Sequence, residues 1–145
     1  MAVVRGCRFP DELLYDVKHH VWYREAGQGV IKAGITTVGV ALAREVIVFS
    51  TKRPSAEFEQ GRAFATLESA KWIGSVRSAF DGKVIAVNEE AKRNPELVNS
   101  DCYGKGWLLE VCPAAENWQK NLVTGDAIAA AYEAWMESEA YPGCG

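Results

Sequence analysis

The sequence between residues 63 and 88 reads AFATLESAKWIGSVRSAFDGKVIAVN, and short apolar segments alternate in it with turn residues. Residues 63–67 and 73–76 are two strand candidates, and residues 68–72 between them form a turn that carries Lys71. The Asp81–Gly82 pair is a strong turn signal, and residues 83–88 alternate as a half-buried strand does. The spacing predicts one hairpin with a lysine at its tip and a second hairpin packed behind it.

The rest of the chain continues this pattern of short strands. Residues 21–24, 30–36, 45–50 and 107–111 are further strand candidates, residues 38–43 a short helix, and residues 9–14 an N-terminal helix that begins at a proline. Near the C-terminus, apolar residues recur at helical spacing after Thr124 and predict an amphipathic helix over about 124–139, packed on the body or docked on a partner. The residues of this stripe are Ile128, Ala131, Tyr132, Trp135 and Met136. The expected fold class is therefore mainly β, a sandwich or barrel with a short N-terminal helix and a C-terminal helix.

The composition limits the function classes. The chain has 145 residues, enough for one domain, and 16 basic against 19 acidic residues give a net charge of -3. That balance argues against nucleic acid as a partner, because phosphate binding needs concentrated positive charge. No segment approaches the ~20 apolar residues of a membrane span, and no secretion signal is visible, so we expect a cytoplasmic protein.

Arrangements typical of catalysis or metal binding are sparse. His19 and His20 are adjacent, so on a strand they would point to opposite faces and could not chelate one ion. The four cysteines are scattered without a C-x-x-C pair, which argues against zinc, and we expect reduced thiols. We expect Cys112 to be partly buried and Cys144 to be exposed. A self-sufficient enzyme is not indicated, and no catalytic or metal-ligating residue is predicted.

Lys71 is the informative residue. A loop lysine is ordinarily a solvated cation, but a rigid hairpin that projects one lysine also suits the covalent attachment of a swinging cofactor. A modifying enzyme can read such a hairpin, and the arm can then reach several active sites in turn.

The segment around Lys71 resembles the lipoylation hairpin of glycine cleavage H proteins, in which E-S-x-K carries lipoate in amide linkage. Further segments match that family in order over about residues 18–112, which makes the resemblance specific. They are His20-Val21-Trp22, Gly34-Ile35-Thr36, the run from Ser78 to Asn88, the run from Asn94 to Asn99, and the run from Tyr103 to Leu108.

The resemblance implies a single domain over residues 1–145 with a core at about 18–112, folded as the flattened β-barrel, or hybrid sandwich, of lipoyl domains. It implies lipoate bound covalently to Lys71, with Glu68 and Ser69 read by the enzyme that attaches it. It also implies a carrier without catalytic activity of its own.

Several departures from the family pattern are similar to the lipoate-binding proteins of bacterial and archaeal sulfur oxidation. Trp72 follows the lysine where H proteins usually have a small residue, and Cys102 replaces the usual proline before Tyr103. The segments at 6–16 and 122–126 also depart from the usual pattern. This likeness implies an arm that shuttles sulfur intermediates or reducing equivalents.

The partners that this second likeness implies are a lipoate-protein ligase, a heterodisulfide-reductase-like complex and dihydrolipoamide dehydrogenase. Cys7 and Cys102 are candidates for thiol exchange with the arm if they lie beside the hairpin. Two alternatives stay open: a glycine cleavage H protein that carries an aminomethyl group, and a non-lipoylated scaffold or binding protein.

Overall fold

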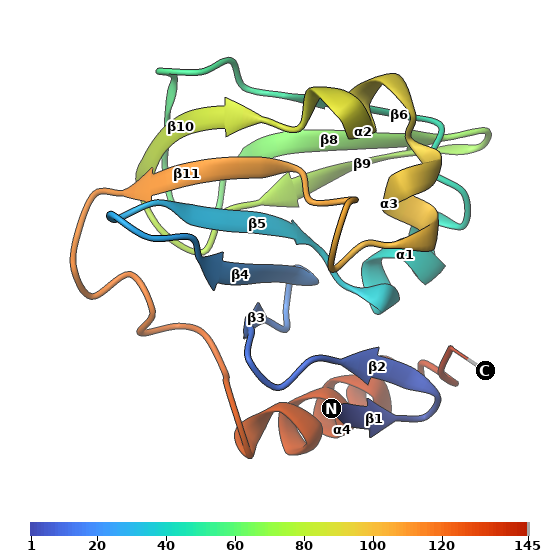
Figure 1. The fold of residues 1–145 in the computed structure, drawn as a ribbon. Coiled ribbons are helices and arrows are strands. Elements are labelled where there is room, and N and C mark those ends of the chain that lie inside the picture. The colour runs from blue at the N-terminus through green and yellow to red at the C-terminus, as the bar shows by residue number, and fades with distance from the viewer. Residues whose placement is uncertain (145) are drawn as a thin grey trace.

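The chain folds into two packed β-sheets, with a small hairpin and a helix attached at one side (Figure 1). The computed structural model describes residues 1–144. The six-stranded sheet contains, in spatial order, β3 (Leu14–Asp16), β4 (Val21–Glu25), β5 (Ile31–Ile35), β11 (Leu109–Pro113), β10 (Gly82–Val87) and β7 (Glu57–Phe58). The three-stranded sheet contains β6 (Val48–Thr51), β8 (Ala63–Ser69) and β9 (Trp72–Arg77). All of these pairings are antiparallel, and the mainly β sandwich expected from the sequence is confirmed.

The main hydrophobic core lies between these two sheets. Phe49, Phe64 and Leu67 enter it from the three-stranded sheet, and Tyr23 and Val111 enter it from the six-stranded sheet. Alternation is interrupted on β8, where the register shifts between Ala63 and Ala65 and both Phe64 and Ala65 are buried. On β4, Trp22 lies next to Tyr23 and is buried in a second core. Three short helices border the core: α1 (Thr37–Ala43), α2 (Glu89–Arg93) and α3 (Glu96–Ser100).

A second, smaller core joins the two ends of the chain. Strands β1 (Ala2–Val4) and β2 (Cys7–Phe9) form a hairpin that packs against α4 (Ala127–Ser138) (Figure 1). Tyr132 stacks on Phe9 with ring centroids 4.0 Å apart, and Ile128 and Met136 are buried on the same helix face. The predicted stripe of α4 therefore packs on the body of the protein.

The predicted N-terminal helix over 9–14 is wrong. Residues 2–9 pair as a hairpin instead, and Pro10 begins a turn in which its carbonyl accepts hydrogen bonds from the Leu13 amide and the Tyr15 hydroxyl. Burial of Phe9 in the second core fixes this conformation, and that long-range contact outweighs the local helix signal.

The expectation of reduced thiols is also wrong for two of the four cysteines. Cys7 and Cys144 form a disulfide across a sequence separation of 137 residues. The C-terminal segment that carries Cys144 is held by the Arg5 guanidinium, which donates to the Tyr141 carbonyl, and by the Cys144 amide, which donates to the Arg5 carbonyl. Cys112, expected to be partly buried, is an exposed free thiol.

The second hairpin predicted at Asp81–Gly82 does not form between β9 and β10. Strand β10 crosses to the other sheet and pairs with β7 and β11, because Val84 and Phe80 are buried in the core between the sheets. The Asp81 carboxylate instead accepts a hydrogen bond from the Gln60 amide at 2.7 Å.

Candidate functional site

The candidate site is the tip of the β8–β9 hairpin. Ser69 pairs with Trp72, so the loop between the two strands consists of only Ala70 and Lys71. Neither loop residue takes a positive φ, so both fit the turn without backbone strain. Lys71 is exposed, and none of the ion pairs formed within residues 1–144 involves it. The loop that carries Lys71 lies at the end of the β8–β9 hairpin, which extends from the body of the protein (Figure 1).

The base of the hairpin is anchored in the main core. Phe64 and Leu67 on β8 are buried, and Leu67 lies across from Phe49 on β6. Strand β8 is thus held by ladders to β6 and β9 on its two edges and by the core on one face. The hairpin is a rigid support for the one side chain at its tip.

Trp72 shapes the strand that leaves the tip. A Cβ added to Gly74 would lie 2.0 Å from the Trp72 ring, so the indole folds back along β9 over the glycine. The ring is still 43% exposed, because the hairpin extends beyond the core here. The sequence analysis missed this contact, although a bulky aromatic residue two positions before a glycine in a strand is its signal.

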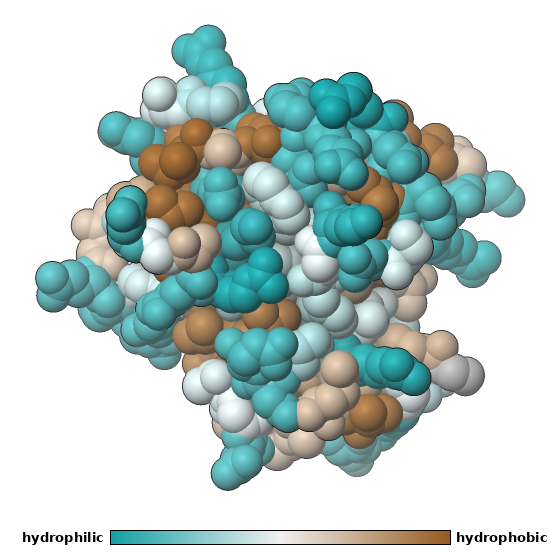
Figure 2. Space-filling view, in the orientation of Figure 1, coloured by the Kyte–Doolittle hydropathy of each residue, from teal (hydrophilic) through white to brown (hydrophobic). Residues whose placement is uncertain are grey.

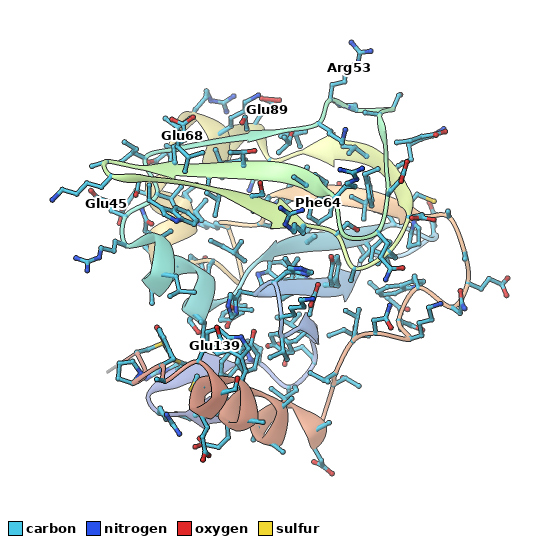
Figure 3. All side chains as sticks on the ribbon, turned by 180° about the vertical axis from the view of Figure 1, so that it is seen from behind. Glu45, Arg53, Phe64, Glu68, Glu89 and Glu139 are labelled. Atoms are coloured by element: carbon cyan, nitrogen blue, oxygen red, sulfur yellow. A yellow bond between two sulfur atoms is a disulfide. The ribbon has the colours of Figure 1, made fainter. Side chains whose placement is uncertain are left out.

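Glu68 and Ser69, predicted to be read by the lipoate-attaching enzyme, occupy the last two positions of β8 before the loop. Both side chains are partly exposed. Glu68 lies between Val48 and Ile73 in the strand register, and Figure 3 shows it on the hairpin close to the tip. The structure thus brings both residues beside Lys71, and their role in recognition stays a prediction.

The two cysteines predicted to exchange with the arm are placed differently. Cys7 is fully buried, bonded to Cys144 and part of the second core, and the hairpin belongs to the main one. Cys102 is 6% exposed, and burial raises the pKa of its thiol to about 12. Such a thiol is protonated at neutral pH, whereas exchange requires an accessible thiolate. The geometry therefore counts against the predicted exchange for both cysteines.

The two histidines make separate contacts. His19 Nδ1 lies 2.8 Å from the Asp16 carboxylate, whereas the His20 ring packs on Trp135 with centroids 4.4 Å apart. Burial lowers the pKa of His20 to about 4. No cluster of three or more potential metal ligands occurs within the part of the chain that the structure describes.

A partly open pocket lies away from the hairpin tip. It has a volume of about 690 Å³ and opens between the β4–β5 turn and the segment after β11. Both of these segments lie at the opposite end of the molecule from the tip in Figure 1. The walls of the pocket include Ile31, Cys112 and Trp118. Lys71 itself has open surroundings, which suits a group that enters the active site of another protein. No helix of residues 1–144 has the length and apolar character needed to cross a bilayer.

Comparisons with known proteins agree with this geometry. The family model described as "Glycine cleavage H-protein" matches residues 13–135. The chain is 39% identical over 127 residues to "Glycine cleavage system H protein 5" of Aquifex aeolicus, covering 85% of each chain. It is 38% identical over 141 residues to a Sulfurisphaera tokodaii protein named "Probable glycine cleavage system H protein 2", covering 96% of this chain and 95% of the relative.

A solved structure supports the same fold. The glycine cleavage system H protein of Mycobacterium marinum superposes with a TM-score of 0.74 at 23% identity, covering 87% of this chain and 99% of the other. The extent of the family match and the relatives' identities together show the family. The chain belongs to the glycine cleavage H-protein family, whose members carry lipoate covalently on a lysine and have no catalytic activity of their own.

Proposed function

We propose that this protein carries lipoate as an amide on Lys71 and serves the glycine cleavage system as its aminomethyl carrier. The observation that carries the proposal is the placement of Lys71 in the two-residue loop of an anchored hairpin, within the family's E-S-x-K motif. The amine is exposed and free of ion pairs within residues 1–144, so it fits an acyl group without breaking a contact.

The chain's own residues supply position rather than chemistry. When bound, lipoate provides a strained cyclic disulfide that can be reduced, can hold a transferred group on sulfur and can be reoxidised. The β8–β9 ladder keeps the root of the arm fixed, and Ala70 and Lys71 give it a short pivot. Acylation also removes the positive charge of Lys71, which leaves Glu68 as the nearest charge along β8.

The partners of this proposal are a lipoate-protein ligase, which loads Lys71, and a dihydrolipoamide dehydrogenase, which reoxidises the arm. Glycine decarboxylase and the aminomethyltransferase would load and unload the one-carbon group. We place the protein in the cytoplasm, where these enzymes would meet it.

Sulfur oxidation is the second candidate, and the names of the relatives favour glycine cleavage over it. Trp72 is the residue that favours a role in sulfur oxidation, because its indole replaces the small side chain that the family usually has next to the lysine. Aquifex aeolicus relatives numbered 2, 3 and 5 also indicate several copies in one organism.

Loading of the arm separates the two candidates. The lipoylated protein is incubated with an extract of its source organism and with either isotopically labelled glycine or labelled thiosulfate. The mass of the peptide that contains Lys71 is then measured by mass spectrometry. Glycine-dependent mass on this peptide supports the aminomethyl carrier, and thiosulfate-dependent mass supports the sulfur carrier. A Lys71→Arg variant is the control and acquires neither label. A Lys71 that its own host leaves unmodified would favour the scaffold alternative instead.

A further inference from the structure

The last residues of β8 lie beyond the main core. Glu68 and Ser69 are only partly buried, and the residues that flank Glu68 in the sheet, Val48 and Ile73, are 46% and 69% exposed. Figure 2 shows apolar surface in brown at the right of the view, where Figure 1 places this end of the hairpin. Burial therefore contributes little to the order of this end, which depends on backbone hydrogen bonds.

Those hydrogen bonds come from β9 on one edge and from the residues that lead into β6 on the other. Val48 pairs with Glu68, and the Ile47 amide donates to the Glu68 carbonyl at 2.8 Å. The Ile47 side chain is exposed, so this residue supports the hairpin through its backbone. Figure 3 shows Glu45, two residues earlier, at the same end of the molecule as Glu68. The conformation of residues 45–47 thus determines how the end of β8 is supported.

Asn99 fixes this segment from helix α3. The Val46 amide donates to Asn99 Oδ1 at 2.8 Å, and Asn99 Nδ2 donates to the Val46 carbonyl at 3.0 Å. One side-chain amide therefore satisfies both backbone groups of one residue, as a neighbouring strand would otherwise do. Asn99 Nδ2 also donates to the Glu96 carboxylate at 3.3 Å, which holds the amide in this orientation. We call these contacts between Asn99 and Val46 the clamp.

Both sides of the clamp are anchored in the main core. Val98, next to Asn99 on α3, is fully buried, and the Val46 side chain is buried in the same core. Ile47 follows Val46 directly, so its amide is held in place beside Glu68. Asn99 ends the run from Asn94 to Asn99 that resembles the family pattern, and its own amide contacts Val46 and Glu96 rather than the lysine.

We propose that Asn99 is a positioning residue for lipoate attachment, and that it acts through Val46 and Ile47 to hold the end of β8 in the conformation that the attaching enzyme binds. The inference rests on the proposed function, since it concerns acylation of Lys71. Without the clamp, the hydrogen bond between Ile47 and Glu68 opens more often, and the end of β8 frays. The enzyme then meets the ordered hairpin in a smaller fraction of molecules, so KM rises while kcat is unchanged.

The test compares Asn99→Ala with a matched variant, Asn88→Ala. Asn88 Nδ2 donates to the carbonyls of Lys105 and Trp107, both at 2.8 Å, and its Oδ1 accepts from the Ala91 amide at 3.1 Å. Each replacement removes the same number of hydrogen bonds from one side-chain amide, so we expect similar losses of stability in urea unfolding. Asn99 bonds to the segment beside Glu68, whereas Asn88 bonds to the segment before β11 and to α2.

Two readouts are needed, both on the full-length protein. The first is hydrogen exchange of the Ile47 amide, and the second is the steady-state kinetics of lipoate attachment by the lipoate-protein ligase of the source organism. For Asn99→Ala we expect about tenfold faster exchange at Ile47, which is about 1.4 kcal/mol of lost protection. We also expect KM to rise about fivefold with kcat unchanged. Asn88→Ala is expected to change neither the exchange at Ile47 nor KM.

A second variant tests the route from the clamp to the hairpin. Ile47→Pro removes the donor to the Glu68 carbonyl and leaves Asn99 in place. It should raise KM by the same factor, and its combination with Asn99→Ala should add no further rise, because both changes act through one hydrogen bond. Ile47→Pro also decides the inference if Asn99→Ala does not fold.

The outcomes separate this inference from the function beneath it. If the original protein accepts no lipoate on Lys71, the proposed function fails. If the original protein is loaded and Asn99→Ala or Ile47→Pro has the same KM, the carrier stands and the positioning role is wrong. An equal rise in KM for Asn88→Ala would also overturn the inference, since the effect would then follow a general loss of stability.

Discussion

Loss of the Cys7–Cys144 disulfide is expected to lower the stability of this protein by about 5 kcal/mol. The bond joins residues 137 positions apart, so it closes almost the whole chain into a ring. In the chain-entropy treatment of cross-links, a loop of that length removes about 17 cal/mol/K from the unfolded ensemble, which is about 5 kcal/mol at 25 °C. An unfolding entropy of about 2.1 cal/mol/K per residue over the 145 residues converts this to a Tm lower by about 15 °C.

The assay is thermal unfolding followed by circular dichroism, with and without a reductant. The informative variant is Cys144→Ser, because Cys144 is exposed and its replacement leaves the second core intact. Reductant should lower the Tm of the original protein to that of Cys144→Ser and should not change the variant. Cys112→Ser, at an exposed free thiol, is the control and should unfold like the original protein. An original protein with the same Tm in both conditions would refute the reasoning.

Three further predictions concern single contacts. Gly74→Ala should displace the Trp72 indole, which a new Cβ would approach to 2.0 Å, and the change should appear as a shift in tryptophan fluorescence that Ser75→Ala does not cause. Gly106→Ala should destabilise the fold by about 2 kcal/mol in urea unfolding, because its Cβ would lie 2.3 Å from the Leu97 carbonyl oxygen, and backbone cannot move aside cheaply. The depressed pKa of His20, about 4 against 6.5 unfolded, means that the unfolded state binds more protons between these values. Stability should therefore rise with pH across that window, and His20→Asn, which tolerates the positive φ of this position, should flatten the slope.

Much of the central fold could be predicted from the sequence because its signals are local. Period-two alternation and β-branched residues located β4, β5, β8, β9 and β10, and helical spacing located α4. The turns at residues 26–30 and 70–71 are also marked by small or polar residues. Even here the strand predicted at 45–50 begins later, since β6 starts at Val48.

The N-terminal region could not be predicted because its structure depends on distant partners. Strands β1 and β2 have three residues each, too few for periodicity, and they are ordered by packing on a helix more than 100 residues away. The same long-range packing brings Cys7 to Cys144. Spacing alone does not indicate which cysteines meet.

The candidate site divides in the same way. Lys71 was found from its motif and from the two strand signals around it, and both are local. The placement of Val48 beside Glu68 depends on the register between β6 and β8, and that register is a tertiary property. The placement of Cys7 and Cys102 in buried positions likewise came only with the fold.

The most direct test of the carrier account is the mass of the protein purified from its own source, followed by peptide mapping. The account predicts one lipoyl-amide increment, located on Lys71 and absent from Lys71→Arg. An unmodified Lys71, in a host that lipoylates its other carriers, would contradict the account.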